Sequence, residues 1–149
     1  MISAAFTVDD PVEALHIGLE EIPSDCLLAQ GVRWALSEAK NIHDYQEANG
    51  AVTARYPGMF HVHAVNNACL TIFSLTIGGR DFTKIIGQAV AMGFDNDCTA
   101  ATAGSIAGAV LGRQRLPARW SKNFNNKAMS YLNDHPEFAL NDLLERFTA

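Results

Sequence analysis

The chain has 149 residues, of which 48% are hydrophobic and 18% charged, and its formal net charge is −5 at pH 7. A chain of this length and composition can form one hydrophobic core but is too short for two stable domains. We therefore predict a single domain over residues 1–149. The 11 basic residues are dispersed along the chain. Because phosphate binding needs clustered Lys and Arg, we expect no nucleic-acid partner.

The cysteines and the hydropathy pattern indicate in which cellular compartment the protein is found. Cys26, Cys69 and Cys98 are odd in number and widely spaced, which is typical of neither a disulfide framework nor a Cys-x-x-Cys zinc site. The sequence shows no basic-then-apolar signal segment, and no apolar run reaches the ~20 residues of a membrane span. We therefore expect a cytoplasmic protein with no membrane partner.

The first two expected elements are helical. The apolar segment Met1–Phe6 lacks a cap and predicts the tail of a helix that begins before this sequence. Asp10, Pro11 and Glu13 provide an N-cap, a proline at the first helical position and an acid three residues after the cap. They predict a helix that runs to Pro23, because its apolar residues recur at three- and four-residue intervals.

Three more helix starts follow along the chain. Ser24-Asp25 is expected to begin a second helix, an antiparallel neighbour of the first, and Asp44 with Glu47 begins a third that ends near Tyr56. A loop containing His61 and His63 leads into an apolar helix over Ala64–Ile77, which Gly78-Gly79 terminates.

The remainder is also predicted to be helical. Asp81 caps a helix that runs to Met92 and delivers the chain to an acidic loop. Beyond Arg113 the pattern weakens, although the apolar residues between Phe124 and Leu132 indicate one more helix and Asn141 begins a last short one. The expected fold class is therefore all-α.

The stretch Gly93–Gly112 combines an acidic loop with a helix of small residues. Asp95 and Asp97 stand just before the apolar run, so we place them at a helix N-terminus with Asp97 near the cap. Gly104 and Gly108 lower helix propensity by about 1 kcal/mol each relative to alanine. Close packing against a neighbouring helix is the simplest explanation for keeping glycine there.

Two interpretations of Asp95 and Asp97 are open from the residues alone. Mg²⁺ takes oxygen ligands in octahedral geometry, and paired carboxylates at a rigid helix entry suit it. An acidic turn with an N-cap is the alternative, because Asp-x-Asp is common in turns.

Other candidate ligand-binding residues lie upstream. His61 and His63 could contact a phosphate, a ribose hydroxyl or a metal, or could pack on a helix entry; alternation places them on opposite sides of an extended loop, so at most one faces a cleft. Asn66 and Asn67 begin the apolar helix, where one can cap while the other lines a site. Gly93 is a further candidate in the acidic loop.

These residues carry a family resemblance. Gly93–Gly112 resembles the C-terminal metal-binding signature of the ADP-ribosylglycohydrolases, Asp-Thr-Asp-Thr or Asp-Thr-Asp-Cys followed by a small-residue helix. His61–Ala68 and Gly79–Phe82 resemble the blocks before that signature, and Leu116–Trp120 the block after it. The sequence is thus similar to the C-terminal half of the family's domain, without its N-terminal Thr-Asp-Asp-Thr motif.

The resemblance implies an all-helical hydrolase that cleaves the bond between ADP-ribose and an acceptor with two Mg²⁺ ions. Asp95 and Asp97 match the aspartates of the signature, and Cys98 matches its third position, where a thiol is a poor ligand for a hard ion. Since the other ligands belong to the missing motif, we expect weak, incomplete Mg²⁺ binding and no activity of the chain alone.

Two hypotheses about function follow. One is a hydrolase of this family, or the C-terminal part of one, completed by a separate N-terminal half chain or by homo-oligomerisation and binding an ADP-ribose-like ligand. The other is a non-catalytic helical interaction module. We expect a homo-oligomer, because the apolar faces of Met1–Phe6 and Ala64–Ile77 would otherwise be exposed. The face at Gly104 and Gly108 is a candidate contact between copies.

Overall fold

The computed structural model describes residues 1–148. The chain divides into two compact units, Met1–Leu116 (unit 1) and Pro117–Ala149 (unit 2). The single domain expected over residues 1–149 stays a prediction.

Unit 1 is helical throughout. Its α-helices are α1 (Pro11–Glu20), α2 (Leu27–Glu38), α3 (Tyr45–Arg55), α4 (Ala64–Gly78), α5 (Phe82–Ala91) and α6 (Asn96–Leu111), with short 3-10 helices η1 (Ala4–Phe6), η2 (Ala39–Asn41) and η3 (Arg113–Arg115). The expected all-α class is confirmed. No helix in the described part of the chain is both long enough and apolar enough to cross a membrane.

Most helices begin where capping side chains predict. The Asp10 carboxylate accepts from the Val12 amide at 2.7 Å, and Asp44 and Asp81 cap α3 and α5 in the same way. Such caps satisfy backbone N–H groups that have no partner within the helix. The start of α2 differs by two residues from the prediction, because the Cys26 sulfur rather than Ser24-Asp25 caps the helix.

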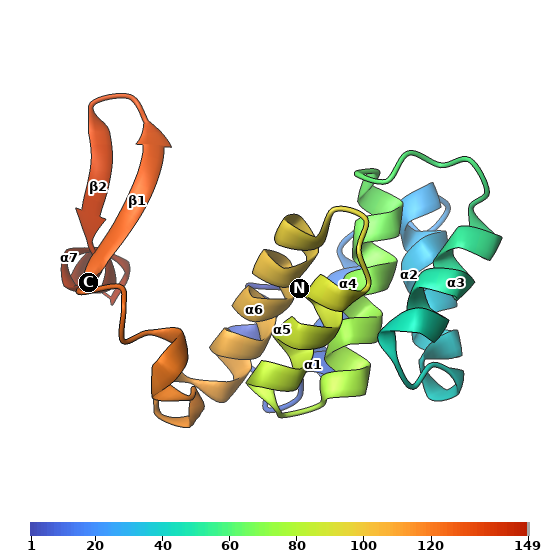
Figure 1. Ribbon diagram of the computed structural model, residues 1–149, viewed down its shortest axis with the longest axis horizontal. Helices are drawn as coiled ribbons and strands as arrows, with labels where there is room; N and C mark the ends of the chain where they lie inside the picture. Colours follow the sequence, from blue (N-terminus) through green and yellow to red (C-terminus); the bar gives the residue numbers. More distant parts are fainter. Residues whose placement is uncertain (149) are drawn as a thin grey trace. The chain divides into compact units, whose positions relative to one another are not determined.

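Helix α4 is the core of unit 1. It packs against α2, α5 and α6, with smaller contacts to α1 and α3, and Figure 1 shows it between α5 and α2. Its fully buried apolar side chains include Leu70, Ile72, Phe73 and Leu75. The expectation that the Ala64–Ile77 helix leaves an apolar face exposed is therefore wrong, since helices of the same chain cover it.

The small-residue face of α6 lies against α5. A Cβ added at Gly104 would lie 3.1 Å from Ile86 Cδ1, and one at Gly108 would lie 4.0 Å from Phe82 Cε2. Close packing therefore accounts for Gly104, but a methyl group would fit at Gly108. Because α5 is the neighbour of this face, its proposed use as a contact between copies loses its structural basis.

The N-terminal segment differs from the expected helix tail. Residues 4–6 form the 3-10 helix η1, in which Ala5 is buried. Met1 lies against α1 at Gly18, where an added Cβ would come within 2.2 Å of Met1 Cγ. The absence of a side chain at Gly18 is what permits this close approach.

Unit 2 holds a hairpin where the sequence predicted a helix. It contains η4 (Ala118–Trp120), β1 (Lys127–Leu132), β2 (His135–Ala139) and α7 (Leu140–Thr148). The strands are antiparallel, with Met129 opposite Glu137 and an irregularity between Met129 and Leu132. The helix expected between Phe124 and Leu132 is wrong, because residues in left-handed conformation at Asn126 and Asp134 bound a strand instead. The short final helix is confirmed.

Candidate functional site

A tight turn brings the chain from α5 into α6. Gly93 and Phe94 both adopt left-handed backbone conformations, with φ of 74° and 58°. Glycine adopts this conformation without strain, whereas a phenylalanine there is uncommon. The Asn49 side-chain amide on α3 holds the turn by donating to the Met92 carbonyl at 2.7 Å. The turn places Asp95 at the N-cap of α6.

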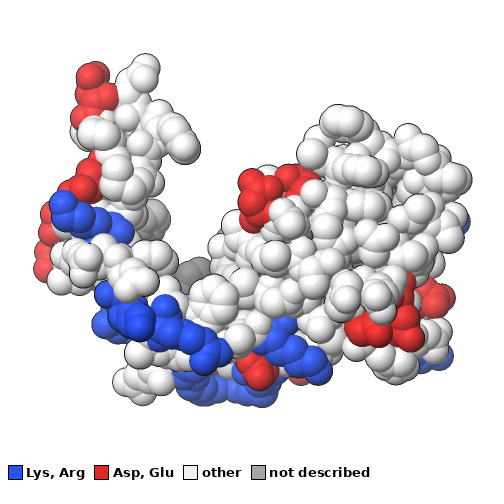
Figure 2. Space-filling model, in the orientation of Figure 1, with Lys and Arg blue, Asp and Glu red and all other residues white. Residues whose placement is uncertain are grey.

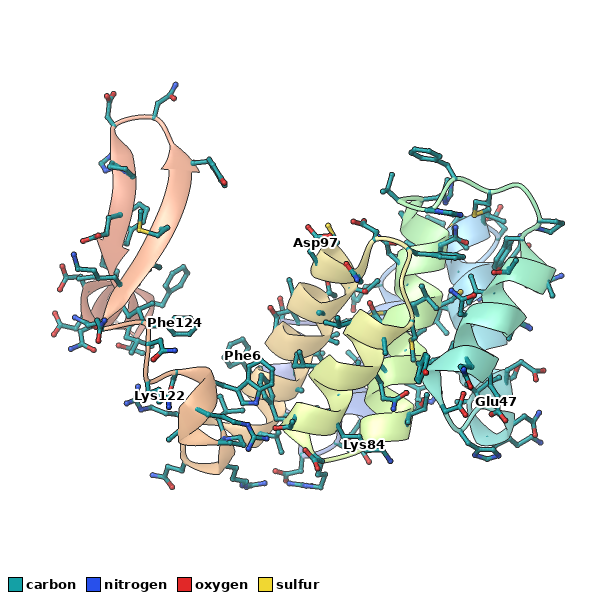
Figure 3. All side chains as sticks on the ribbon, viewed as in Figure 1. Phe6, Glu47, Lys84, Asp97, Lys122 and Phe124 are labelled. Atoms are coloured by element: carbon teal, nitrogen blue, oxygen red, sulfur yellow. The ribbon has the colours of Figure 1, made fainter. Side chains whose placement is uncertain are left out.

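Asp95, Asp97 and Cys98 form an acidic cluster at the N-terminus of α6. One ligand atom from each lies within 4.8 Å of the others. Figure 2 shows acidic side chains gathered at this end of α6, and Figure 3 shows Asp97 at the helix tip. The N-cap is Asp95, whereas Asp97 lies in the first turn, so the turn at residues 93–94 shifts the expected cap by two residues. The positive end of the helix dipole favours both carboxylates.

The Asp95 carboxylate is bound by side chains rather than by the backbone amides of its own helix. It accepts no hydrogen bond from the first amides of α6, which is unusual for an aspartate at an N-cap. Its Oδ2 accepts instead from the Asn67 amide of α4. A hydrogen bond with Asp95, together with desolvation and the nearby negative charges, raises the pKa of the exposed Cys98 thiol. Near neutral pH that thiol is therefore protonated.

The two asparagines of α4 bind different segments. Asn66 is 1% exposed and donates to the Phe60 carbonyl at 3.0 Å, which fixes the loop before α4. Asn67 donates to Asp95, on the loop before α6. The amide oxygens of both are buried and have no hydrogen-bond partner within the described chain. The first turn of α4 therefore holds both loops that surround the acidic cluster.

The two histidines are separated by their loop. The His61 ring stacks on Phe94 with centroids 4.6 Å apart and an interplanar angle of 10°. His63 Nδ1 instead accepts from the Val65 amide at 3.2 Å and caps α4. His61 is therefore the histidine that lies beside the turn at residues 93–95.

An open, largely apolar cavity of about 310 Å³ lies next to this turn. Its volume is at the lower end of the range of small-molecule sites. It is lined by Thr53, Tyr56, Gly58, Met59, Phe60, His61 and Phe94. Since Phe94 lines the cavity and Asp95 follows it directly, the cavity and the acidic cluster share one turn of chain.

The donor set of the cluster fits a hard cation in part. The two carboxylates offer the oxygen ligands that Mg²⁺ prefers. The Cys98 thiol is a poor ligand for such an ion. The arrangement can hold Mg²⁺ through a few protein oxygens, with water at the other positions.

Sequence reasoning missed two residues that shape this region. Phe94 forms one wall of the cavity, and its position between Gly93 and Asp95 is a local signal that it lies at the site. Asn49 holds the same turn from a position 43 residues away in sequence. No local pattern indicates that contact.

Comparison with known proteins gives one result. The family model described as ADP-ribosylglycohydrolase matches residues 1–148. No curated protein and no solved structure matches the chain. The match extends over both units and includes the acidic cluster, the two asparagines and the cavity. The chain therefore belongs to the ADP-ribosylglycohydrolase family.

Proposed function

We propose that this protein is a hydrolase, or part of one, that cleaves the bond between ADP-ribose and an acceptor with the help of Mg²⁺. The observation that carries the proposal is the acidic cluster at the N-terminus of α6, in a chain that belongs to this family. Asp95 and Asp97 would hold the ion. When bound, Mg²⁺ polarises an oxygen of the reacting group and stabilises the negative charge that develops on it.

The cavity supports an ADP-ribose-like ligand. The stacked rings of His61 and Phe94 offer a flat face to a base or a ribose, and the imidazole can donate a hydrogen bond to a phosphate. Phe94 lines the cavity and leads directly to Asp95. A ligand that spans the cavity and the cluster would be held beside the carboxylates, which lowers the entropy cost of reaction.

The cluster leaves coordination positions open. Two carboxylates and a thiol do not fill six positions around Mg²⁺, and the described residues provide no further acidic, Cys or His ligand to the cluster. We propose that a second chain, either another copy or a separate half of the enzyme, supplies the remaining ligands. The chain alone is then inactive or nearly so.

A binding experiment tests the proposal without requiring turnover. Two-dimensional NMR of the ¹⁵N-labelled chain, titrated with ADP-ribose in the presence of Mg²⁺, should shift amides near His61, Phe94 and Asp95. Phe94→Ala should weaken binding, and Phe124→Ala, an exposed phenylalanine of unit 2, is the matched control. Shifts that are absent, or that map elsewhere, would contradict the proposal.

The same titration addresses the alternative function. A non-catalytic interaction module has no need of the ligand, so it would show neither ADP-ribose binding nor a response to Mg²⁺. Hydrolysis is measured separately, as release of free ADP-ribose from an ADP-ribosylated protein by the chain at high concentration. Turnover that Asp97→Ala abolishes would support assembly of the site between copies.

A further inference from the structure

We infer that Asn67 is a positioning residue: it holds the Asp95 carboxylate in the orientation that binds a divalent cation. The inference rests on the proposed function, because it concerns the cation site at the acidic cluster. It assigns to α4 a part in a site whose acidic residues all lie at the N-terminus of α6.

The first observation is the orientation of the Asp95 carboxylate. An aspartate at an N-cap normally accepts from the amides of the first helical turn. Asp95 makes no such bond. Its carboxylate is bonded instead to the Cys98 thiol of its own helix and to Asn67, which lies 28 residues earlier in the chain and holds the carboxylate from outside α6.

The second observation is the rigidity of Asn67. It is the fourth residue of α4, and its own backbone amide is bonded to the His63 carbonyl at 3.1 Å. Its neighbours Val65 and Asn66 are both buried. A side chain on the buried central helix provides a fixed reference for a carboxylate on a loop.

The third observation concerns the oxygen of the Asn67 side-chain amide. Its Oδ1 is buried and has no hydrogen-bond partner within the described chain. A buried amide oxygen without a partner is costly, and such an atom in a folded protein calls for an explanation. The other end of the same amide is bonded to Asp95, so we infer that water bound to a cation at the acidic cluster donates to this oxygen.

Variants at Asn67 test whether this residue positions the Asp95 carboxylate or only stabilises the loop before α6. Asn67→Ala removes both the donor and the oxygen. Asn67→Asp keeps the size but places a second negative charge against Asp95, and like charges at this distance repel unless a cation lies between them. The matched control is Asn49→Ala, which removes an amide that holds the same turn through the Met92 carbonyl and does not contact Asp95.

The experiment measures the thermal midpoint of the full chain with and without MnCl₂, together with Mn²⁺-induced broadening of the amides at residues 95–99. For Asn67→Ala we expect at least tenfold weaker Mn²⁺ binding, since loss of an outer contact to a ligand typically costs roughly 10–100-fold. Asn67→Asp should melt earlier than wild type without Mn²⁺ and gain more from Mn²⁺ than wild type does. Asn49→Ala should melt earlier but should bind Mn²⁺ with an affinity close to that of wild type.

The outcomes are distinguishable. If wild type shows no Mn²⁺ response, the proposed cation site fails and the inference with it. If wild type responds and Asn67→Ala responds equally, the inference alone is overturned. Equal loss of Mn²⁺ binding in Asn49→Ala would also overturn it, because general order of the turn would then explain the effect. If Asn67→Ala does not fold, a larger Mn²⁺ response of Asn67→Asp supports the inference, and an unchanged or smaller one overturns it.

Discussion

Asp97 and Asp95 differ in how firmly the protein holds them. Asp95 is half-buried and bonded to Asn67, whereas Asp97 is exposed in the first turn of α6. An exposed carboxylate is hydrated and mobile, so its affinity for a cation depends on the second carboxylate beside it. The two residues should therefore act together as a weak site.

Removal of one carboxylate should abolish metal binding. Calorimetry should give a dissociation constant for Mg²⁺ or Mn²⁺ on the order of millimolar in wild type, because most of the coordination shell remains water. Asp97→Ala should bind neither ion detectably. The control is Asp142→Ala, which removes another exposed aspartate from the first turn of a helix, α7. Micromolar affinity that survives Asp97→Ala would contradict the site.

The cysteines should react with iodoacetamide at rates set by their surroundings. The thiolate is the nucleophile, so a raised pKa lowers the reactive fraction at a given pH. Burial raises the pKa of Cys69 to about 12, and this residue should stay unmodified in the folded protein. Cys98 is exposed but its pKa is also raised, first by its hydrogen bond with Asp95.

At pH 8, Cys98 should therefore react more slowly than a cysteine in a short peptide. Asp95→Asn removes the negative charge, which lowers the Cys98 pKa and should increase the rate. Peptide mass spectrometry over time measures each site. A Cys98 rate that is unchanged in Asp95→Asn would show that the contact with Asp95 does not govern its reactivity.

At the scale of elements, the packing of helices depends on which glycines lie against backbone. A Cβ at Gly78, the last residue of α4, would lie 2.8 Å from both Cα and N of Ile85. Backbone atoms of α5 cannot move aside as a side chain can. Gly108 in α6 has only Phe82 Cε2 at 4.0 Å, an ordinary contact distance.

Alanine should therefore have opposite effects at these two helical glycines. Gly78→Ala should lower the free energy of unfolding by about 1–3 kcal/mol through overpacking. Gly108→Ala should raise it by about 0.5–1 kcal/mol, because alanine has the higher helix propensity. Urea unfolding followed by circular dichroism measures both. A destabilising Gly108→Ala would mean that α6 has a close neighbour at this face beyond Phe82.

Both units of the molecule expose large apolar side chains, but the units differ in whether a buried core lies beneath them. No described side chain of residues 117–148 is fully buried, whereas unit 1 has a continuous core. So small a unit does not bury enough surface to be stable alone, and a two-stranded hairpin is marginal in water. The exposed apolar side chains of unit 2 are Phe124, Met129, Tyr131, Leu132, Leu144 and Phe147.

We still expect a homo-oligomer, with the contact at unit 2 rather than at α4. Light scattering at micromolar concentration should give a mass above the 16.2 kDa of one chain. Tyr131→Glu with Phe147→Glu should return it to the monomer mass, because both rings are almost fully exposed. Phe6→Glu, at an exposed ring of unit 1, is the control. A monomeric wild type would refute the prediction.

The helices of unit 1 and the grouping of the acidic residues follow from the local sequence. Caps such as Asp10, Asp44 and Asp81 accept from amides two or three residues away. A short stretch of sequence is therefore enough to predict where these helices begin. Asp95, Asp97 and Cys98 cluster for the same reason, since they share one turn of chain.

The surroundings of that cluster depend instead on how the helices pack. The contacts from Asn67 to Asp95, from Asn49 to Met92 and from His61 to Phe94 join residues that lie 28 to 43 positions apart or on separate loops. Such contacts depend on how α3, α4 and α6 pack, which local periodicity does not specify. The hairpin of unit 2 was not predicted because its first strand carries apolar residues at spacings that also suit a helix. The left-handed backbone conformations at Asn126 and Asp134 favour the strand over the helix.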